Sequence, residues 1–186
     1  MHTSIQNTML FLLIASTSIV ASPVPSITEL NTSQPTAANG TAGTAGTTPF
    51  CSPQVKALVD GINANIADQR NEQAAVTVMG YVLQESPIDT TIFDAAKASL
   101  LTYVQKGITI RQNNQQITPP GNAATEGLAT VAAAQQEELN LSNSLSASDV
   151  KGSTATVEKL KTDFAGGIAK NQENVAAAAK GCKVNA

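Results

Sequence analysis

Apolar side chains recur every three or four residues over most of the chain beyond residue 50. The first such stripe follows Ser52 and Pro53 and contains Val55, Leu58, Val59, Ile62 and Ile66. This spacing places the side chains on one face of an α-helix, and a Ser followed by Pro is a typical helix start. The stripe continues more loosely to about Glu85, so the pattern predicts one long helix or two short ones with a break near residues 70–71.

Similar stripes predict further helices. Asp89 is the expected cap of the second helix, which Pro119 and Pro120 must end because proline cannot continue a helix. A third helix is expected over residues 122–146 and a fourth over residues 149–180, with Gly181 as its stop signal. No segment alternates with period two, so strands are not expected. Because each amphipathic helix needs a partner, we expect an all-α, up-down bundle of four helices, or five if the first is split.

The first 50 residues have a different character. An apolar run followed by small residues, over positions 9–22, predicts a secretory signal peptide at residues 1–21. Residues 22–50 are rich in Ser, Thr, Pro and Gly and are expected to form a disordered linker. The bundle domain is assigned to residues 51–182, with a short tail at 183–186. No second apolar run is long enough to cross a bilayer, so we expect a secreted protein without a transmembrane segment, in the extracellular space or the cell wall.

Short motifs add candidate sites for glycans. Three Asn-X-Ser/Thr sequons, at Asn31, Asn39 and Asn140, are candidates for N-glycosylation. Two of them lie in the expected linker, where a secreted chain is accessible.

The two cysteines, Cys51 and Cys182, stand just before the first predicted helix and just after the last. In a secreted chain such a pair indicates a structural disulfide; a redox or metal-binding pair would normally show CxxC spacing. Both chain ends meet at one pole when the number of antiparallel helices is even, so the pair also favours four helices over five. In the chain-entropy model, closing so long a loop stabilises the fold by about 4 to 5 kcal/mol.

Composition argues against several functions. A net charge of −3 with only 13% charged residues does not fit a nucleic-acid-binding surface. The single histidine, His2, falls in the expected signal peptide, which removes imidazole catalysis and histidine-ligated metals. The carboxylates Glu137 and Glu138 are interpreted as a solvated helix face. We therefore expect no enzyme activity, cofactor or metal site.

Three polar residues remain as candidates for binding or for fixing helix register. Arg111 could hold a carboxylate or a lipid headgroup, or form a surface ion pair. Gln135 and Asn171 occupy positions where the stripes call for apolar residues. Such amides can fix helix register, orient a ligand inside the bundle, or lie partly exposed at the edge of an Ala-rich face.

Two segments, FDAAKASLLTYVQKGI and NAATEGLATVAAAQQEELNLSNSL, are rich in Ala, in a chain with only 3% aromatic residues. With the expected signal and linker, the chain resembles small secreted proteins of filamentous fungi, broadly the hydrophobic surface-binding and cell-wall galactomannoprotein group. The resemblance covers residues 51–180 in pattern and composition. It implies a non-enzymatic wall or extracellular protein that binds a hydrophobic surface or a lipid, in a groove of small side chains such as Ala96, Ala132 and Ala179. The alternative is a secreted effector that binds a host protein or glycan through its bundle surface.

Overall fold

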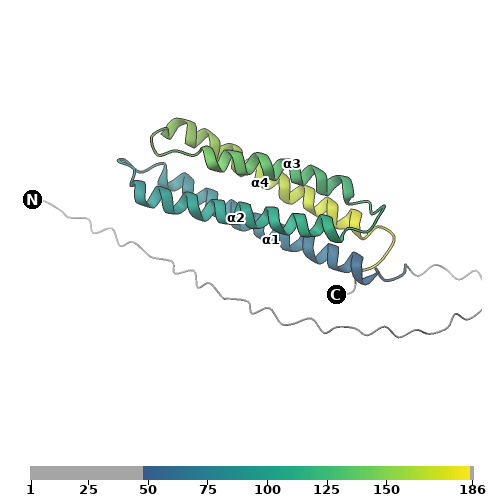
Figure 1. Cartoon of the computed structure of the whole chain (residues 1–186). Coiled ribbons are helices and arrows are strands. Elements are labelled where there is room, and N and C mark those ends of the chain that lie inside the picture. The colour runs from purple at the N-terminus through teal and green to yellow at the C-terminus, as the bar shows by residue number, and fades with distance from the viewer. Residues whose placement is uncertain (1–47, 185–186) are drawn as a thin grey trace, which may run out of the picture. The chain divides into compact units, whose positions relative to one another are not determined.

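A computed structural model describes residues 48–184, which form a bundle of four antiparallel helices (Figure 1). The helices are α1 (Pro53–Val82), α2 (Thr90–Ile117), α3 (Thr125–Ser144) and α4 (Val150–Ala178). α1 and α3 each pack against both α2 and α4, so α1 lies diagonally opposite α3. The predicted all-α bundle is confirmed, with four helices and not five. None of the described helices is long and apolar enough to span a membrane.

Capping residues set the helix starts as the sequence indicates. The Ser52 hydroxyl accepts a hydrogen bond from the Val55 amide at 3.3 Å, and Asp89 accepts from the Thr91 amide at 2.8 Å. Asp149 caps α4 in the same way, accepting from the Gly152 amide at 3.0 Å. These bonds satisfy amide groups that the first helical turn leaves without partners. α1 passes residues 70–71 without a break, so the predicted long helix forms and the split alternative is wrong.

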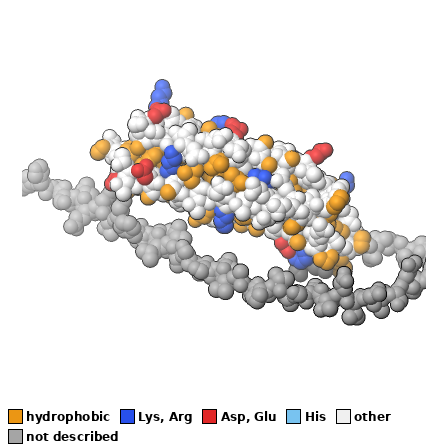
Figure 2. Space-filling model, viewed as in Figure 1, with side chains coloured by type: hydrophobic (Ala, Val, Ile, Leu, Met, Phe, Trp, Pro, Cys, Tyr) orange, Lys and Arg blue, Asp and Glu red, His pale blue; other side chains and the backbone are white. Residues whose placement is uncertain are grey.

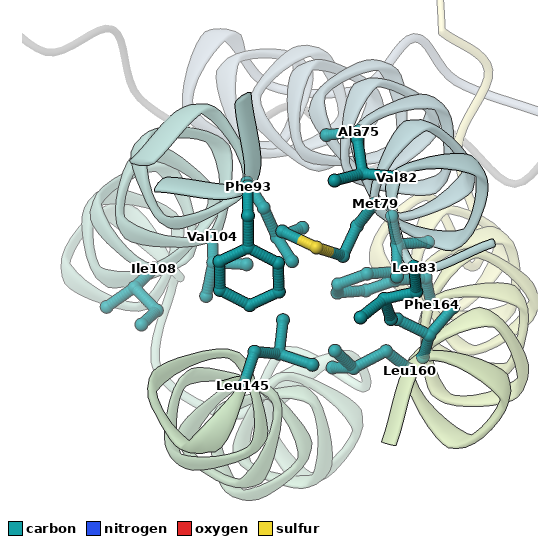
Figure 3. Packing of buried hydrophobic residues seen from close by; sticks show 13 residues of the cluster. Ala75, Met79, Val82, Leu83, Phe93, Val104, Ile108, Leu145, Leu160 and Phe164 are labelled. Carbon is teal, nitrogen blue, oxygen red and sulfur yellow. The ribbon is translucent and has the colours of Figure 1, made fainter. Parts of the chain in front are cut away.

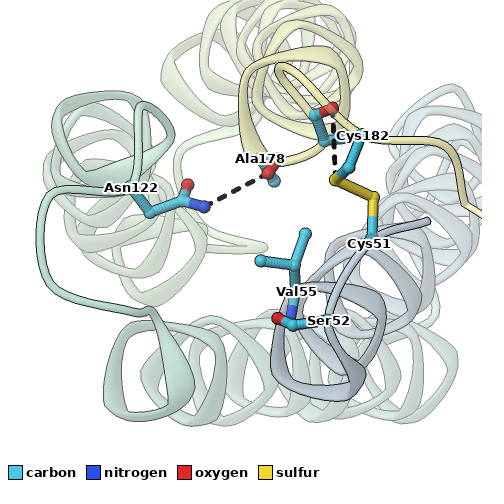
Figure 4. The surroundings of a disulfide bond; sticks show 7 residues. Cys51, Ser52, Val55, Asn122, Ala178 and Cys182 are labelled. Atoms are coloured by element: carbon cyan, nitrogen blue, oxygen red, sulfur yellow. Dashed lines mark hydrogen bonds between the residues drawn. A yellow bond between two sulfur atoms is a disulfide. The ribbon is translucent and has the colours of Figure 1, made fainter. Parts of the chain in front are cut away.

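A disulfide between Cys51 and Cys182 joins the two ends of the bundle, as predicted (Figure 4). Backbone bonds flank it: the Cys51 amide donates to the Lys183 carbonyl at 2.9 Å, and the Lys183 amide donates to the Pro49 carbonyl at 2.8 Å. Gly181 has a φ of 86°, which glycine adopts without steric cost and which turns the chain back after α4. We call this end, with the disulfide and the α2–α3 connection, the clasp pole. The opposite end, with the connections 83–89 and 145–149, is the loop pole.

The apolar core is divided into two parts along the bundle axis. The loop-half cluster is the larger and includes Met79, Phe93, Leu100, Leu160 and Phe164 (Figure 3). The clasp-half cluster contains Leu58, Ile62, Ala124, Leu128 and Ala178, among others. Between the two clusters, positions that face the bundle axis carry polar side chains.

The α3–α4 hairpin repeats the α1–α2 hairpin in sequence. A constant separation of 66 residues relates three positions of α1 to α3: Gly61 to Gly127, Gln69 to Gln135, and Glu72 to Glu138. A constant separation of 60 residues relates α2 to α4: Asp89 to Asp149, Leu100 to Leu160, Gly107 to Gly167, and Asn114 to Asn174. The bundle therefore consists of two similar hairpins, and equivalent residues can be compared directly.

Candidate functional site

A layer of buried polar side chains crosses the middle of the bundle. Its members are all at most 2% exposed and come from every helix: Asn65, Asp68, Gln69, Glu72, Asn114, Gln135, Glu138, Ser142, Asn171 and Asn174. Burying a polar group costs free energy unless it is hydrogen-bonded. So many buried polar groups in one place make this layer, which we call the polar layer, the most unusual feature of the core.

One half of the polar layer converges on Gly107 of α2. A Cβ atom at Gly107 would lie 2.6 Å from Glu72 Oε1, 3.2 Å from Asp68 Oδ2 and 3.2 Å from Gln135 Nε2. Only glycine leaves room for these three groups to meet. Arg111 Nε donates to Gln135 Oε1 at 3.2 Å, which fixes the amide so that its nitrogen is the end near Gly107. Two carboxyls and one amide nitrogen therefore share a small buried space.

The other half has the same design around Gly167 of α4. Asn171, the equivalent of Arg111, donates from Nδ2 to Gln69 Oε1 at 3.0 Å and to Asn65 Oδ1 at 2.8 Å. The other end of the Gln69 amide, Nε2, lies against Gly167. A Cβ atom added at Gly167 would collide with Gln69 Nε2 and would lie 3.8 Å from Glu138 Oε1. Each glutamate thus has a glycine of the neighbouring helix, and a glutamine from the other hairpin, at its side.

Charge distinguishes the two halves. Asp68 is 1% exposed and pairs with Lys106, whose Nζ lies 2.7 Å from Asp68 Oδ1 and whose side chain is 57% exposed. In the second hairpin the equivalent positions hold Ala134 and Gly166, so this ion pair has no counterpart there. Lys159 instead contacts Glu137 and Asp163 at the surface, at 2.9 and 3.0 Å.

Burial changes the protonation of both central glutamates. Desolvation, with smaller contributions from the Glu138 and Asp68 charges, raises the pKa of Glu72 to about 9. Desolvation, with contributions from Asp163 and Glu137, raises the pKa of Glu138 to about 7. Burial also raises the pKa of Asp68, although the bond to Lys106 opposes the shift. At neutral pH Glu72 is therefore uncharged, and Glu138 is close to its midpoint.

The surface has hollows away from this layer. One, of about 890 Å³, lies at the loop pole between the two inter-helix connections. Core side chains Leu83, Phe93 and Leu145 contribute to its wall. Lys97 also lines it and donates from Nζ to the carbonyls of Asn143 and Leu145, both at 2.7 Å. A second hollow, of about 550 Å³, lies between α3 and α4 over Ala134, Gly166 and Gly167.

Gln135 and Asn171 belong to the two halves of the polar layer, and Arg111 borders the layer through its bond to Gln135. Arg111 Nη1 donates to Gln115 Oε1 at 2.9 Å and its Nε donates to Gln135 Oε1 at 3.2 Å, and within residues 48–184 it forms no ion pair. Gln135 and Asn171 are 1% and 0% exposed, so the partly exposed alternative is also wrong. Their bonds join α2 to α3 and α4 to α1, which fits a role in helix register.

Among the predicted glycan sites, Asn31 and Asn39 lie outside the described residues. Asn140 is exposed on α3, and its Oδ1 accepts a hydrogen bond from Gln136. The serine of its sequon, Ser142, is fully buried in the polar layer. The folded helix therefore does not present this sequon as a flexible, accessible segment.

Some sequence interpretations need correction. Glu138 was expected on a solvated face, but it is fully buried, while its neighbour Glu137 faces solvent and pairs with Lys159. The small residues expected to line one groove are separated: Ala96 packs against the loop-half cluster and Ala179 against the clasp-half cluster. Asp68, Gln69 and Glu72 were not foreseen as core residues. Their signal was the repeat, since Gln69 and Glu72 recur as Gln135 and Glu138.

Within residues 48–184, no group of three or more His, Cys, Asp or Glu side chains is arranged to hold a metal ion. No family model, curated protein or solved structure matches this chain.

Proposed function

We propose that this is a secreted, non-enzymatic protein that binds an apolar chain or adsorbs to an apolar surface through its loop pole. The observation that carries the proposal is the hollow of about 890 Å³ at that pole, with Leu83, Phe93 and Leu145 in its wall. A volume of this size is in the range of pockets that bind small ligands. The expected signal peptide and the disulfide are consistent with an extracellular location.

Exposed apolar side chains also occur at this pole. Tyr81, near the end of α1, is 65% exposed, and Val150, at the start of α4 and lining the hollow, is 40% exposed. Ile92, in the first turn of α2, is 39% exposed. Phe50, which is 69% exposed, lies at the clasp pole, and Figure 2 shows charged side chains distributed over the face in view, several of them beside one of opposite charge. Of the three, Val150 lines the hollow itself, and an exposed apolar side chain at the edge of a hollow fits a binding site.

The interior of the bundle is a poorer place for an acyl chain. An alkyl chain along the axis would have to cross the polar layer, where Asn171 bonds to Asn65 and Gln69. Breaking those bonds without replacement costs free energy, because the amides would stay buried. We therefore place the apolar contact at the pole and not between the helices.

The experiment measures binding of a fluorescent fatty acid, and depletion of the protein from solution onto hydrophobic beads. Ala147→Trp introduces a bulky ring into the wall of the hollow, and Val150→Ser removes an apolar side chain at its edge. We expect both variants to weaken binding several-fold. Val184→Ser is the matched control, because Val184 is also exposed but lies at the clasp pole.

Failure of the unmodified protein to bind either probe would overturn the proposal. If it then captures one specific host protein or glycan, the effector function is supported instead. Equal binding by the Ala147→Trp variant and the unmodified protein would show that the apolar contact lies elsewhere.

A further inference from the structure

We propose that Glu72 and Asp68 share one buried proton at the centre of the bundle, and that loss of this proton loosens the packing of α1 against α2. The two carboxyls are four residues apart on α1, so they lie on the same face of the helix. Both reach the space above Gly107, as described above. The inference is independent of the function proposed for the loop pole.

Hydrogen-bond accounting supports a neutral Glu72. Both Glu72 oxygens, Asp68 Oδ2 and Gln135 Nε2 are buried and have no hydrogen-bond partner. If Glu72 carries a proton, its hydroxyl can donate to Asp68 Oδ2 while its other oxygen accepts from Gln135 Nε2. Lys106 then neutralises Asp68 from the far side, 2.7 Å from Oδ1. One proton thus gives a partner to each of these groups.

Without the proton, the same space holds two negative charges. The titratable groups that act on Glu72 are Asp68 from α1, Lys106 from α2 and Glu138 from α3. From α4, Asp163 and Lys159 act on Glu138. Lys106 is the cation that lowers the Glu72 pKa, and its half-exposed side chain is already paired with Asp68. Arg111 of α2, the other cation nearby, is bonded to Gln135 and Gln115. Repulsion between the two carboxylates would push them apart, and Gly107 offers no side chain to hold the contact.

The second hairpin provides a comparison within the molecule. Glu138 has Ala134 where Glu72 has Asp68, and it has Ser142 where Glu72 has Val76. Ionised Glu138 can therefore accept hydrogen bonds from Gln69 Nε2 and from the Ser142 hydroxyl, which is buried and free of other partners. The second hairpin therefore offers hydrogen-bond donors that stabilise the carboxylate form of Glu138. The first hairpin offers an acceptor that stabilises the carboxylic acid form of Glu72. The raised pKa values, about 9 for Glu72 and about 7 for Glu138, follow the same order.

The direct test is to follow the Glu72 side-chain carboxyl carbon by NMR during a pH titration of the full secreted chain. We expect Glu72 to remain protonated at neutral pH and to titrate well above the usual value of 4.5. A titration near 4.5 would overturn the proposal. This measurement needs no variant, so it decides the question even if substitutions in the layer impair folding.

The consequence is tested by amide hydrogen exchange across α1 and α2, expressed as protection relative to intrinsic rates. Because the folded state holds the proton and the unfolded state releases it above 4.5, protection from global opening should fall as the pH rises toward 9. In Glu72→Gln, which keeps size and polarity, we expect this decline to be smaller by up to about tenfold per pH unit. Glu173→Gln, at an exposed glutamate that pairs with Lys170 and does not act on Glu72 or Glu138, should behave as the unmodified protein does. An unchanged decline in Glu72→Gln would contradict the coupling.

Discussion

The α1–α2 hairpin and the α3–α4 hairpin bring the same glycine, glutamine and glutamate to the polar layer, but surround the glutamate differently. Glu72 has a second carboxyl, Asp68, beside it above Gly107, whereas the equivalent Glu138 has Ala134 at that position and the buried Ser142 four residues further along α3. A shared backbone design therefore supports two electrostatic settings. The difference shows that glycine contacts set the position of a buried acid, while its neighbours set its protonation.

The largest expected effect comes from removing the disulfide that joins the free ends of the two hairpins. Cys51→Ser with Cys182→Ser opens a clasp between residues 131 positions apart. The chain-entropy model gives a loss of about 4 to 5 kcal/mol in the free energy of unfolding, measured by urea denaturation. The control is the unmodified protein with reductant, which should match the double variant. A loss below about 1 kcal/mol would show that the hairpins associate without help from the clasp.

Features of the fold that depend on local sequence could be predicted, whereas features that depend on contacts between helices could not. Helix starts at Ser52, Asp89 and Asp149 depend on local capping, and the disulfide follows from cysteine positions, so sequence was sufficient for both. Burial of Glu72 and Glu138 depends on a glycine of the neighbouring helix that lies opposite each glutamate. Such contacts are part of the tertiary structure. Periodicity alone cannot show it, because a polar residue on a helical stripe resembles one at the edge of an apolar face.

The pH dependence of the free energy of unfolding distinguishes Glu138 from Glu72. Burial raises the pKa of Glu138 from 4.5 to about 7, so the folded state binds this proton more tightly than the unfolded state. The resulting stability is complete below about pH 4.5 and is lost as the pH rises to about 7. In Glu138→Gln the decline over this window should be smaller by up to about 3 kcal/mol, as measured by thermal or urea unfolding.

The decline above pH 7, which comes from Glu72, should persist in Glu138→Gln. If the variant instead loses its pH dependence over the whole range, the two glutamates titrate as one unit and the hairpins are not independent.

Two adjacent glycines in α4, Gly166 and Gly167, test whether the polar layer requires close contact between helices or only the flexibility that glycine gives to a helix. A Cβ at Gly167 would collide with Gln69 Nε2, so Gly167→Ala should lower the free energy of unfolding by about 1 to 3 kcal/mol. Gly166 has no atom within 4 Å of its Cβ position, so Gly166→Ala should raise it by about 0.5 to 1 kcal/mol. Urea denaturation of the pair measures both effects. The same sign for both variants would contradict the packing argument.

The smallest expected effect concerns the ion pair that the first hairpin alone possesses. Lys106→Met keeps the aliphatic stem but removes the cation from buried Asp68, whose pKa should rise further. Because the Lys106 side chain is 57% exposed, solvent screens the pair, and we expect a loss of about 1 kcal/mol in the free energy of unfolding at neutral pH. Lys170→Met is the control, because Lys170 pairs with the exposed Glu173, and its removal should change stability by less than about 0.5 kcal/mol. Equal effects in the two variants would mean that Asp68 is neutral in the folded protein, and that the proton in the first hairpin is held without help from Lys106.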